Sequence, residues 1–184
     1  MKVVALAFAL ANQEKLSACS LGISIYEDGV FVDNYAFLLL PPINYRHFSQ
    51  TYLHGISYED VKDEKEFNDI YDKLEVIFKD ALLISHNIKY QIDILNALCD
   101  YYGLDHFKNK YFDTVALMRL IYPSLDNHRL STINEYLELD LELKTAKDIA
   151  EASLSILITT MSKFNYFDIN EFLKATQMKI FINT

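Results

Sequence analysis

The chain is poor in the residues that build linkers and disulfide frameworks. Its 184 residues include 4 glycines, 3 prolines, 2 cysteines and no tryptophan. So few glycines and prolines leave little room for long flexible linkers or low-complexity segments. The two cysteines, Cys19 and Cys99, lie far apart in apolar segments, which indicates buried thiols and not a disulfide framework or a metal cluster. A chain of this length builds one compact domain with a substantial core.

Basic residues are also scarce. The chain carries 17 Lys and Arg against 26 Asp and Glu, a formal net charge of −9. Affinity for nucleic acid usually rests on Lys and Arg, so this balance argues against a general nucleic-acid surface while leaving room for a local basic groove. No stretch reaches the ~18 apolar residues of a membrane span. The apolar start, residues 1–6, is interpreted as a buried first strand and not as a signal peptide, so we expect a cytoplasmic protein with no membrane partner.

Hydrophobic patterning predicts a mixture of strands and helices. Apolar and β-branched runs predict strands at 2–10, 19–26 and 30–40, the last two joined by a hairpin turn at Asp28-Gly29. After Pro41-Pro42, a loop extends to about Gly55, and the spacing of Ser57 and Asp60 indicates a capped helix start. Further helices are predicted at 66–79, 90–102, 113–121, 131–137 (capped by Ser131), 145–161 and 168–176, with short strands at 81–84, 111–112 and 178–182. Three antiparallel strands followed by alternating helices and strands predict an α/β domain with a mixed sheet.

Seven short motifs occur in a particular order along the chain. They are Ala7-Phe8-Ala9, Ser17-Ala18-Cys19-Ser20, His54-Gly55-Ile56, His86-Asn87-Ile88-Lys89-Tyr90-Gln91, Asp113-Thr114, His128-Arg129-Leu130 and Lys144-Thr145-Ala146-Lys147-Asp148-Ile149-Ala150. The series resembles the DEDDh-type 3′–5′ exonucleases (DnaQ-like), the family of the proofreading epsilon subunit of bacterial DNA polymerase III. The resemblance spans residues 2–157. It implies a ribonuclease H-like exonuclease fold, with a mixed sheet of five or slightly more strands and flanking helices. We expect this domain to occupy residues 1–161, with a C-terminal extension at 162–184 packed on it.

The same resemblance implies a reaction that this chain is poorly equipped to perform. The family uses two Mg²⁺ or Mn²⁺ ions, which in two-metal sites lie ~3.5–4 Å apart and require mainly carboxylate ligands. Asp-x-Glu on the first strand would place two carboxylates on one face, because side chains alternate along a strand. Ala7 and Ala9 keep that geometry without oxygen atoms, and Gln91 and Ile149 replace the other two carboxylates. Lys144 replaces the histidine that would deprotonate water, and an ordinary lysine is a poor base near neutral pH. We therefore expect no catalytic residue, no metal ligand and no cofactor.

Three acids near the motif positions are candidate substitutes for the missing ligands. Asp148 is turned about 100° around its helix from Ile149, Asp93 is expected to favour a helix dipole, and Glu14 is interpreted as a solvated loop acid. A relocated metal site is therefore not the favoured interpretation.

The remaining polar residues of the motifs have structural or binding interpretations. His54, His86 and His128 are expected to make structural hydrogen bonds, and Asn87 to brace the cleft. The candidate nucleic-acid contacts are Asn12, His54, Asn87 and Lys144, and the candidate stacking residues are Tyr45, Phe48 and Tyr52.

Three functions remain open. The leading hypothesis is an inactive exonuclease fold retained as a module that binds single-stranded nucleic acid or a protein partner. The second is a structural or interaction subunit, such as a homodimer, which the charge of −9 and the C-terminal extension favour. The third is residual metal-dependent 3′–5′ exonuclease activity.

Overall fold

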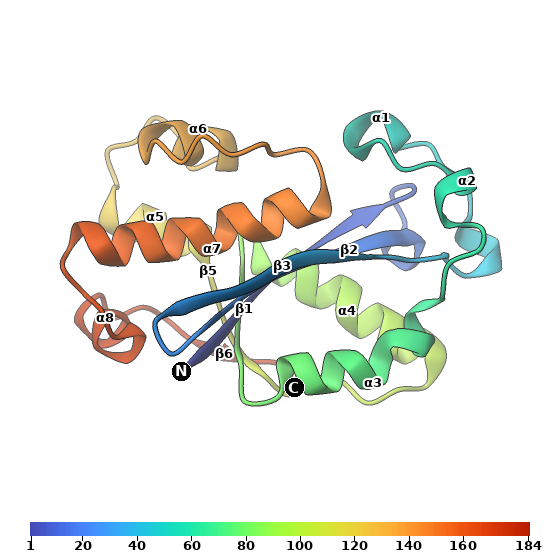
Figure 1. Ribbon diagram of the computed structural model, residues 1–184, viewed down its shortest axis with the longest axis horizontal. Coiled ribbons are helices and arrows are strands. Elements are labelled where there is room, and N and C mark those ends of the chain that lie inside the picture. Colours follow the sequence, from blue (N-terminus) through green and yellow to red (C-terminus); the bar gives the residue numbers. More distant parts are fainter.

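A six-stranded mixed sheet organises the molecule, whose computed structural model describes residues 1–184 (Figure 1). The strands β1 (Lys2–Leu10), β2 (Ala18–Glu27) and β3 (Val30–Leu38) form an antiparallel meander. Next, β4 (Leu82–Ser85) pairs parallel to β1, and β5 (Lys110–Asp113) pairs parallel to β4. The short β6 (Phe181–Ile182) is antiparallel to β5, which completes the order β3-β2-β1-β4-β5-β6. The predicted mixed sheet is confirmed, with one strand more than the minimum of five.

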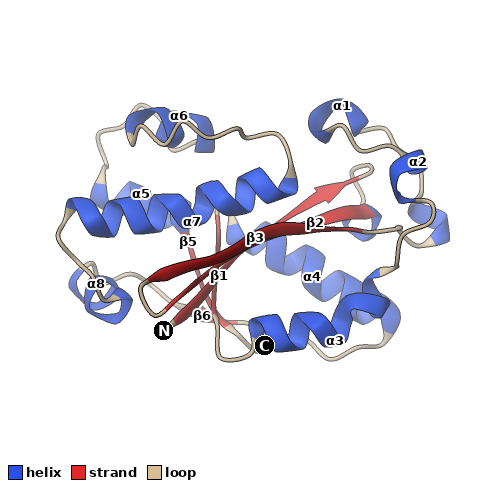
Figure 2. Ribbon diagram, in the orientation of Figure 1, coloured by secondary structure: helices blue, strands red, loops and turns tan.

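Helices cover both faces of the sheet, as Figure 2 shows. On one face α3 (Phe67–Phe78) and α4 (Ile88–Tyr102) pack on residues such as Val4 and Leu6 of β1. On the other face α5 (Thr114–Ile121), α7 (Ala146–Lys163) and α8 (Ile169–Ala175) pack on alternate residues of β1, including Val3 and Ala5. The helix α6 (Leu130–Tyr136) packs on α5 and α7 through Ile133. Because β1 is buried on both faces, it is a continuous apolar run, as its sequence predicted.

The segment predicted as a loop after β3 contains helical turns that the sequence did not reveal. They are η2 (Ile43–Tyr45) and α1 (Thr51–His54), and they precede α2 (Tyr58–Val61). Helical segments of three or four residues contain too few apolar positions to show the helical period of 3.6 residues, so the hydrophobic pattern does not predict them. The predicted capped start at Ser57 is confirmed, because Asp60 accepts hydrogen bonds from the backbone and hydroxyl of Ser57 at 2.7 and 2.6 Å.

Two details of the predicted helices are wrong. The helix α6 begins at Leu130, so Ser131 lies inside it and does not cap it. The turn is instead stabilised by Asn127 Oδ1, which accepts hydrogen bonds from Arg129 N and Thr132 Oγ1. The helix α4 begins at Ile88, two residues earlier than predicted.

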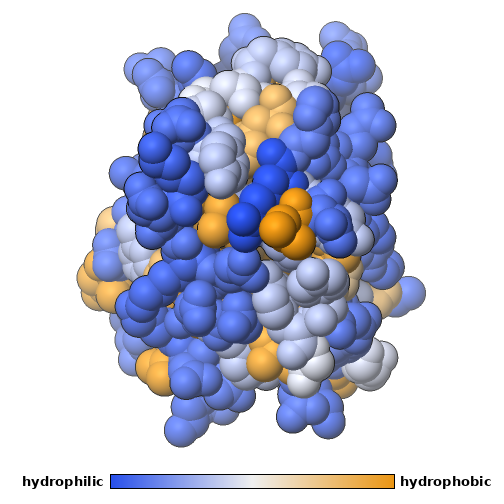
Figure 3. Space-filling model, turned by 90° about the vertical axis from the view of Figure 1, so that its right-hand side faces the viewer, coloured by the Kyte–Doolittle hydropathy of each residue, from blue (hydrophilic) through white to orange (hydrophobic).

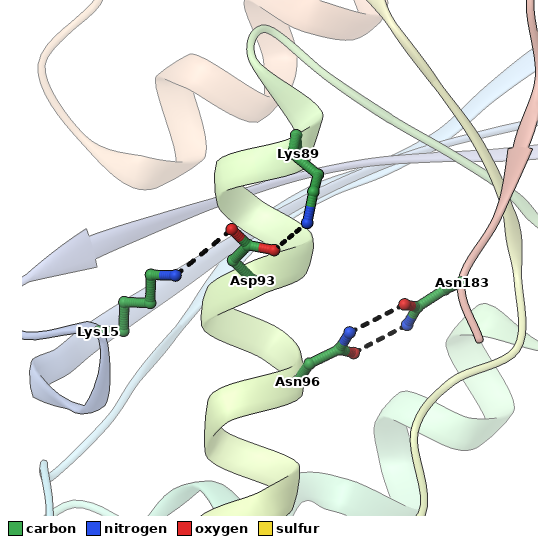
Figure 4. Close-up of polar contacts among 5 residues, drawn as sticks. All are labelled: Lys15, Lys89, Asp93, Asn96 and Asn183. Atoms are coloured by element: carbon green, nitrogen blue, oxygen red, sulfur yellow. Dashed lines mark hydrogen bonds and ion pairs between the residues drawn. The ribbon is translucent and has the colours of Figure 1, made fainter.

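The C-terminal segment completes the sheet. The ring of Phe181 stacks on that of Tyr111 with centroids 5.6 Å apart. Asn183 and Asn96 of α4 exchange two amide hydrogen bonds of 2.8 and 2.9 Å (Figure 4), and Asn183 also donates to the carbonyl of Phe107. The extension therefore packs on the same sheet, while α7 continues through Lys163, so the proposed boundary after residue 161 stays a prediction. No helix is long and apolar enough to cross a membrane.

Both cysteines are free and buried, as expected. The thiol of Cys19 packs in a small apolar cluster, and burial raises its pKa to about 12.

Candidate functional site

The carboxyl-terminal half of β1 carries the first two motif positions, and both are covered. Ala7 and Ala9 lie on one face of the strand and are 1% and 7% exposed. Ala7 packs in the cluster that contains Ala150 of α7. Ala9 packs with Ala146, and the side chains of the loop after β3 close over it. The floor of the site is therefore apolar and excludes solvent.

Small side chains allow α7 to approach the sheet at this point. Gly22 of β2 lies opposite Ala7, and a Cβ atom added to Gly22 would stand 2.1 Å from the carbonyl oxygen of Ala146. That separation is far inside van der Waals contact, so only glycine fits beneath the first turn of α7. Ile149, at the fourth motif position, is half-buried and packs against the same cluster as Ala7.

Gln91 has a specific structural role at the third motif position. Its Oε1 accepts a hydrogen bond of 2.8 Å from the backbone N–H of Phe8 in β1. Because β4 pairs with β1 only along Val3–Ala5, the later N–H groups on that side of β1 have no strand partner. Gln91 is 7% exposed, so its amide oxygen satisfies a backbone donor that would otherwise be unpaired near the core.

Lys144, at the position of the general base, lies on the surface. Its Cε stands 3.8 Å from the point where a Cβ of Gly55 would be, so its stem lies against the C-terminal end of α1. Its ammonium group makes no ion pair. The next residue, Thr145, is the N-cap of α7, which confirms the predicted start of this helix, and it forms a capping box with Asp148.

Two of the three neighbouring acids are held by other partners, and the third, Glu14, is an exposed residue of the loop after β1, as expected. Asp148 accepts hydrogen bonds from the backbone N–H groups of Lys144 and Thr145, at 3.3 and 2.7 Å. Asp93 lies beyond the first turn of α4, so the expected dipole role is wrong, because the helix starts earlier than predicted. It bridges Lys15, at 3.3 Å, and Lys89 (Figure 4), and the hydrogen bond from Lys89 is the main cause that lowers the pKa of Asp93.

The donor set does not match a pair of divalent cations. The five motif positions offer one side-chain oxygen, that of Gln91, and the N–H of Phe8 occupies it. Elsewhere, no three His, Cys, Asp or Glu side chains come together as a metal site. Hard cations need several oxygen ligands, which these residues do not supply.

The three motif histidines make structural hydrogen bonds, as predicted. His54 Nε2 lies 2.9 Å from the carbonyl of Leu10, and its Nδ1 accepts from the backbone N–H of Ile56. His86 bridges Thr114 Oγ1 and the carbonyl of His128, and burial lowers its pKa below the usual value.

His128 Nε2 lies 3.0 Å from the carbonyl of Tyr122. The three imidazoles thus hold together loops at the carboxyl ends of β1 and β4.

Two of the candidate binding residues also have internal partners. The side chain of Asn12 donates to the carbonyls of Tyr45 and His47 and accepts from Glu14 N, so it ties the loop after β1 to η2. Asn87 adopts a left-handed conformation (φ 69°), and its backbone N–H bonds to Asp113 Oδ1. Its side chain makes no capping hydrogen bond and remains a candidate contact.

The helix α1, whose C-terminal end Lys144 contacts, carries exposed aromatic and apolar residues. Tyr52 and Leu53 of α1 are 80% and 52% exposed, while Tyr45 and Phe48 are half-buried. Figure 3 views the molecule from the side on which α1 and α2 lie, and apolar residues form small spots within a mainly hydrophilic surface. The sequence indicates Tyr45, Phe48 and Tyr52 equally as stacking candidates, and the structure separates the exposed ring of Tyr52 from the two half-buried rings.

The comparisons with known proteins agree with this fold. The exonuclease (RNase_T) family model matches residues 45–151, more than half of the chain. The chain belongs to this exonuclease family. The match includes Gln91, Lys144 and Ile149 but not β1, where the first two carboxylates would lie.

The relatives in sequence are parts of much longer proteins. The DNA polymerase III PolC-type of Halalkalibacterium halodurans is 33% identical over 89 residues, which are 48% of this chain and 6% of that protein. The PolC-type polymerase of Caldanaerobacter subterraneus is 29% identical over 133 residues, 72% of this chain and 9% of that protein. The chain therefore spans less than a tenth of the length of these relatives.

Solved structures show the same fold. The nuclease domain of 3′hExo, a DEDDh family member bound to rAMP, covers 100% of this chain with a TM-score of 0.76 and 15% identity, over 96% of its own length. Exonuclease I with bound product has a TM-score of 0.78 and 10% identity and covers 95% of this chain, over 46% of its own length. The ribonuclease H-like exonuclease fold is thereby confirmed.

Proposed function

We propose that this exonuclease-fold chain does not hydrolyse nucleic acid and instead binds single strands at the rim of the former cleft. Two physical reasons support the loss of hydrolysis. The motif positions supply no carboxylate, and α7 closes over Ala7 and Ala9, which leaves no solvated floor for two hydrated cations.

The binding half of the proposal rests chiefly on one observation. Lys144 is an unpaired, exposed ammonium whose stem lies against α1, the helix that presents Tyr52 at 80% exposure. A cation and an exposed aromatic ring on neighbouring elements are the combination that holds a phosphate and stacks a base in single-strand binding. In a metal-dependent site carboxylates repel phosphate until cations bind, whereas here no carboxylate occupies the motif positions.

The structural relatives make a strand the first ligand to test. Exonuclease X has been solved in complex with 5′ overhanging duplex DNA, and it shares the fold at a TM-score of 0.69 with 13% identity. The net charge of −9 opposes extended electrostatic contact, so we expect short contacts of a few nucleotides and strong dependence on salt.

Fluorescence anisotropy with labelled single-stranded DNA and RNA at about 0.1 M salt tests this proposal. We expect binding that persists in a chelator, and a Lys144→Glu variant that binds more weakly with a salt slope smaller by about one. Lys147→Glu makes the same charge change on an exposed neighbour and should bind like the wild type. Tyr52→Ala should lose about 1–3 kcal/mol of binding free energy.

Two results would contradict the proposal. If the wild type and Lys144→Glu both fail to bind strands, the rim has no nucleic-acid function. If labelled strands are shortened in Mg²⁺ or Mn²⁺ and the cleavage stops with a chelator, the chain retains the family's hydrolysis.

A further inference from the structure

The strand β3 forms an open edge of the sheet, and its side chains are unusually apolar for an edge. In Figure 1 it runs in front of the other strands, and β2 is its only strand neighbour. Val30, Phe31, Val32 and Leu38 are 63%, 51%, 54% and 36% exposed. An exposed apolar edge strand is a template for pairing with another chain, and proteins usually protect such edges with lysine, proline or a cover.

Only part of β3 lacks such protection. A bulge at Val32 interrupts the first part, because Phe31 pairs with Tyr26 and Asp33 with Ile25. From Asp33 to Leu38 the strand is regular and contains neither lysine nor proline. Its single charge is Asp33, which accepts a hydrogen bond from its neighbour's backbone N–H and forms no ion pair.

A groove lies beside this regular part. Tyr35 and Phe37 face α3, and together with Val76 and Ile77 they line a groove of about 520 Å³. Lys73 also lines the groove and forms no ion pair. The edge thus offers unpaired backbone, an apolar groove lined by the unpaired cation Lys73, and an unpaired anion, Asp33, two residues before Tyr35 of that groove. Asp72 lines the groove as well, and it also borders the larger hollow on the far side of α3.

We propose that the partner of this edge is a second copy of the same chain, which pairs β3 with β3 antiparallel about a two-fold axis. A two-fold axis perpendicular to the sheet keeps each face of one strand on the same face of the other. Each copy then supplies both the groove and the side chains that enter it. The two sheets join into one, and neither copy keeps an open β3 edge.

The charges of Asp33 and Lys73 favour one alignment of the two β3 strands over another. Two alignments pair five residues of the regular part and keep paired side chains on the same face of the joined sheet. In one the two-fold axis passes through Tyr35, and in the other it passes through Ala36. Centred on Tyr35, the strand places Asp33 opposite Phe37 of the second copy, beside the groove that contains Lys73. Centred on Ala36, it leaves Asp33 beyond the paired segment. The first register gives two Asp33–Lys73 attractions per dimer, so we expect that one.

Sedimentation velocity over about 1 to 200 μM protein tests this pairing, because dimers form by mass action. We expect the wild type to dimerise. Val32→Lys, which adds a cation at the residue just before the paired segment, and Asp33→Lys, which reverses a charge within it, should each raise the dissociation constant at least about tenfold. Asp33→Lys makes the net charge less negative by two, so general repulsion would predict the opposite result. The double variant Asp33→Lys/Lys73→Asp should regain the wild-type dissociation constant.

Leu120→Lys is the matched control. Leu120 lies on α5, away from β3, and its side chain is 52% exposed, close to the 54% of Val32. It should dimerise like the wild type, and circular dichroism should show all variants folded.

A wild type that stays monomeric throughout would overturn the proposal. So would dimers that tolerate both Val32→Lys and Asp33→Lys, or a double variant that stays as weak as Asp33→Lys alone. If the edge instead captures only an added strand-forming peptide, its occupant is not a second copy and the proposal fails.

Discussion

Replacing Gln91 tests whether this position now serves the fold. In Gln91→Met the side chain keeps nearly the same length but loses the acceptor for the N–H of Phe8. A buried donor left without a partner costs about 1–3 kcal/mol. For a domain of this size each kcal/mol lowers Tm by about 2–4 °C, so we expect a drop of about 2–12 °C.

Gln91→Glu is the informative partner variant. A carboxylate at the same reach still accepts the hydrogen bond of 2.8 Å from Phe8, and it also restores an acid to the third motif position. Because Gln91 is 7% exposed, the new charge carries a desolvation cost that the hydrogen bond offsets in part. We expect its stability to lie between those of the wild type and Gln91→Met.

Calorimetry at pH 7 and urea unfolding give the two readouts. Backbone hydrogen exchange at Phe8 adds a local one, since loss of the acceptor should speed exchange there more than at Val4. If Gln91→Met melts within 1 °C of the wild type, the hydrogen bond contributes nothing and our account of this position is wrong.

Three further predictions concern packing, the C-terminal segment and pH. Gly22→Ala should destabilise the fold by about 3 kcal/mol or more in urea unfolding, because its Cβ would overlap the carbonyl of Ala146; a loss below 0.5 kcal/mol would refute this. Asn183→Leu should leave Asn96 without its amide partner, and hydrogen exchange should then show β6 and α8 opening before the rest of the sheet. The pKa of His86 is lowered by burial, so its contribution to stability is present above the unfolded pKa of about 6.5 and is lost as pH falls from there through the folded value. The difference in urea midpoint between the wild type and His86→Gln should therefore narrow from pH 7 to pH 5, and a constant difference would contradict it.

The sheet was predictable because strong local signals agreed with it. Asp28 and Gly29 both adopt positive φ, 51° and 87°, as the hairpin required, and β1 is buried on both faces as its apolar run indicated. The start of α4 was missed because Asn87 begins it in a left-handed conformation, without the side-chain cap that marks most helix starts. Ser131 was wrongly predicted as the cap of α6, because serine is a common capping residue that also occurs inside helices. Here Asn127, before the helix, accepts the hydrogen bonds that stabilise its first turn.

The candidate site was predictable in its chemistry but not in its contacts. The residue types at the five motif positions follow from the sequence alone. The bond from Phe8 to Gln91 joins residues 83 apart, and no local pattern indicates it. No local pattern indicates the contact of Lys144 with Gly55 either, because it depends on how α1 packs near the start of α7.

The packing around β1 bears on whether the missing carboxylates can be restored. Ala7 is 1% exposed and lies under α7, in the same cluster as Ala150. A carboxylate placed there would be buried without a cation, and an uncompensated buried charge costs several kcal/mol. Ala9 is covered in the same way by Ala146. Alanine at both positions lets α7 pack directly on β1, so under the proposed loss of hydrolysis a variant with carboxylates at positions 7 and 9 would also need α7 to move.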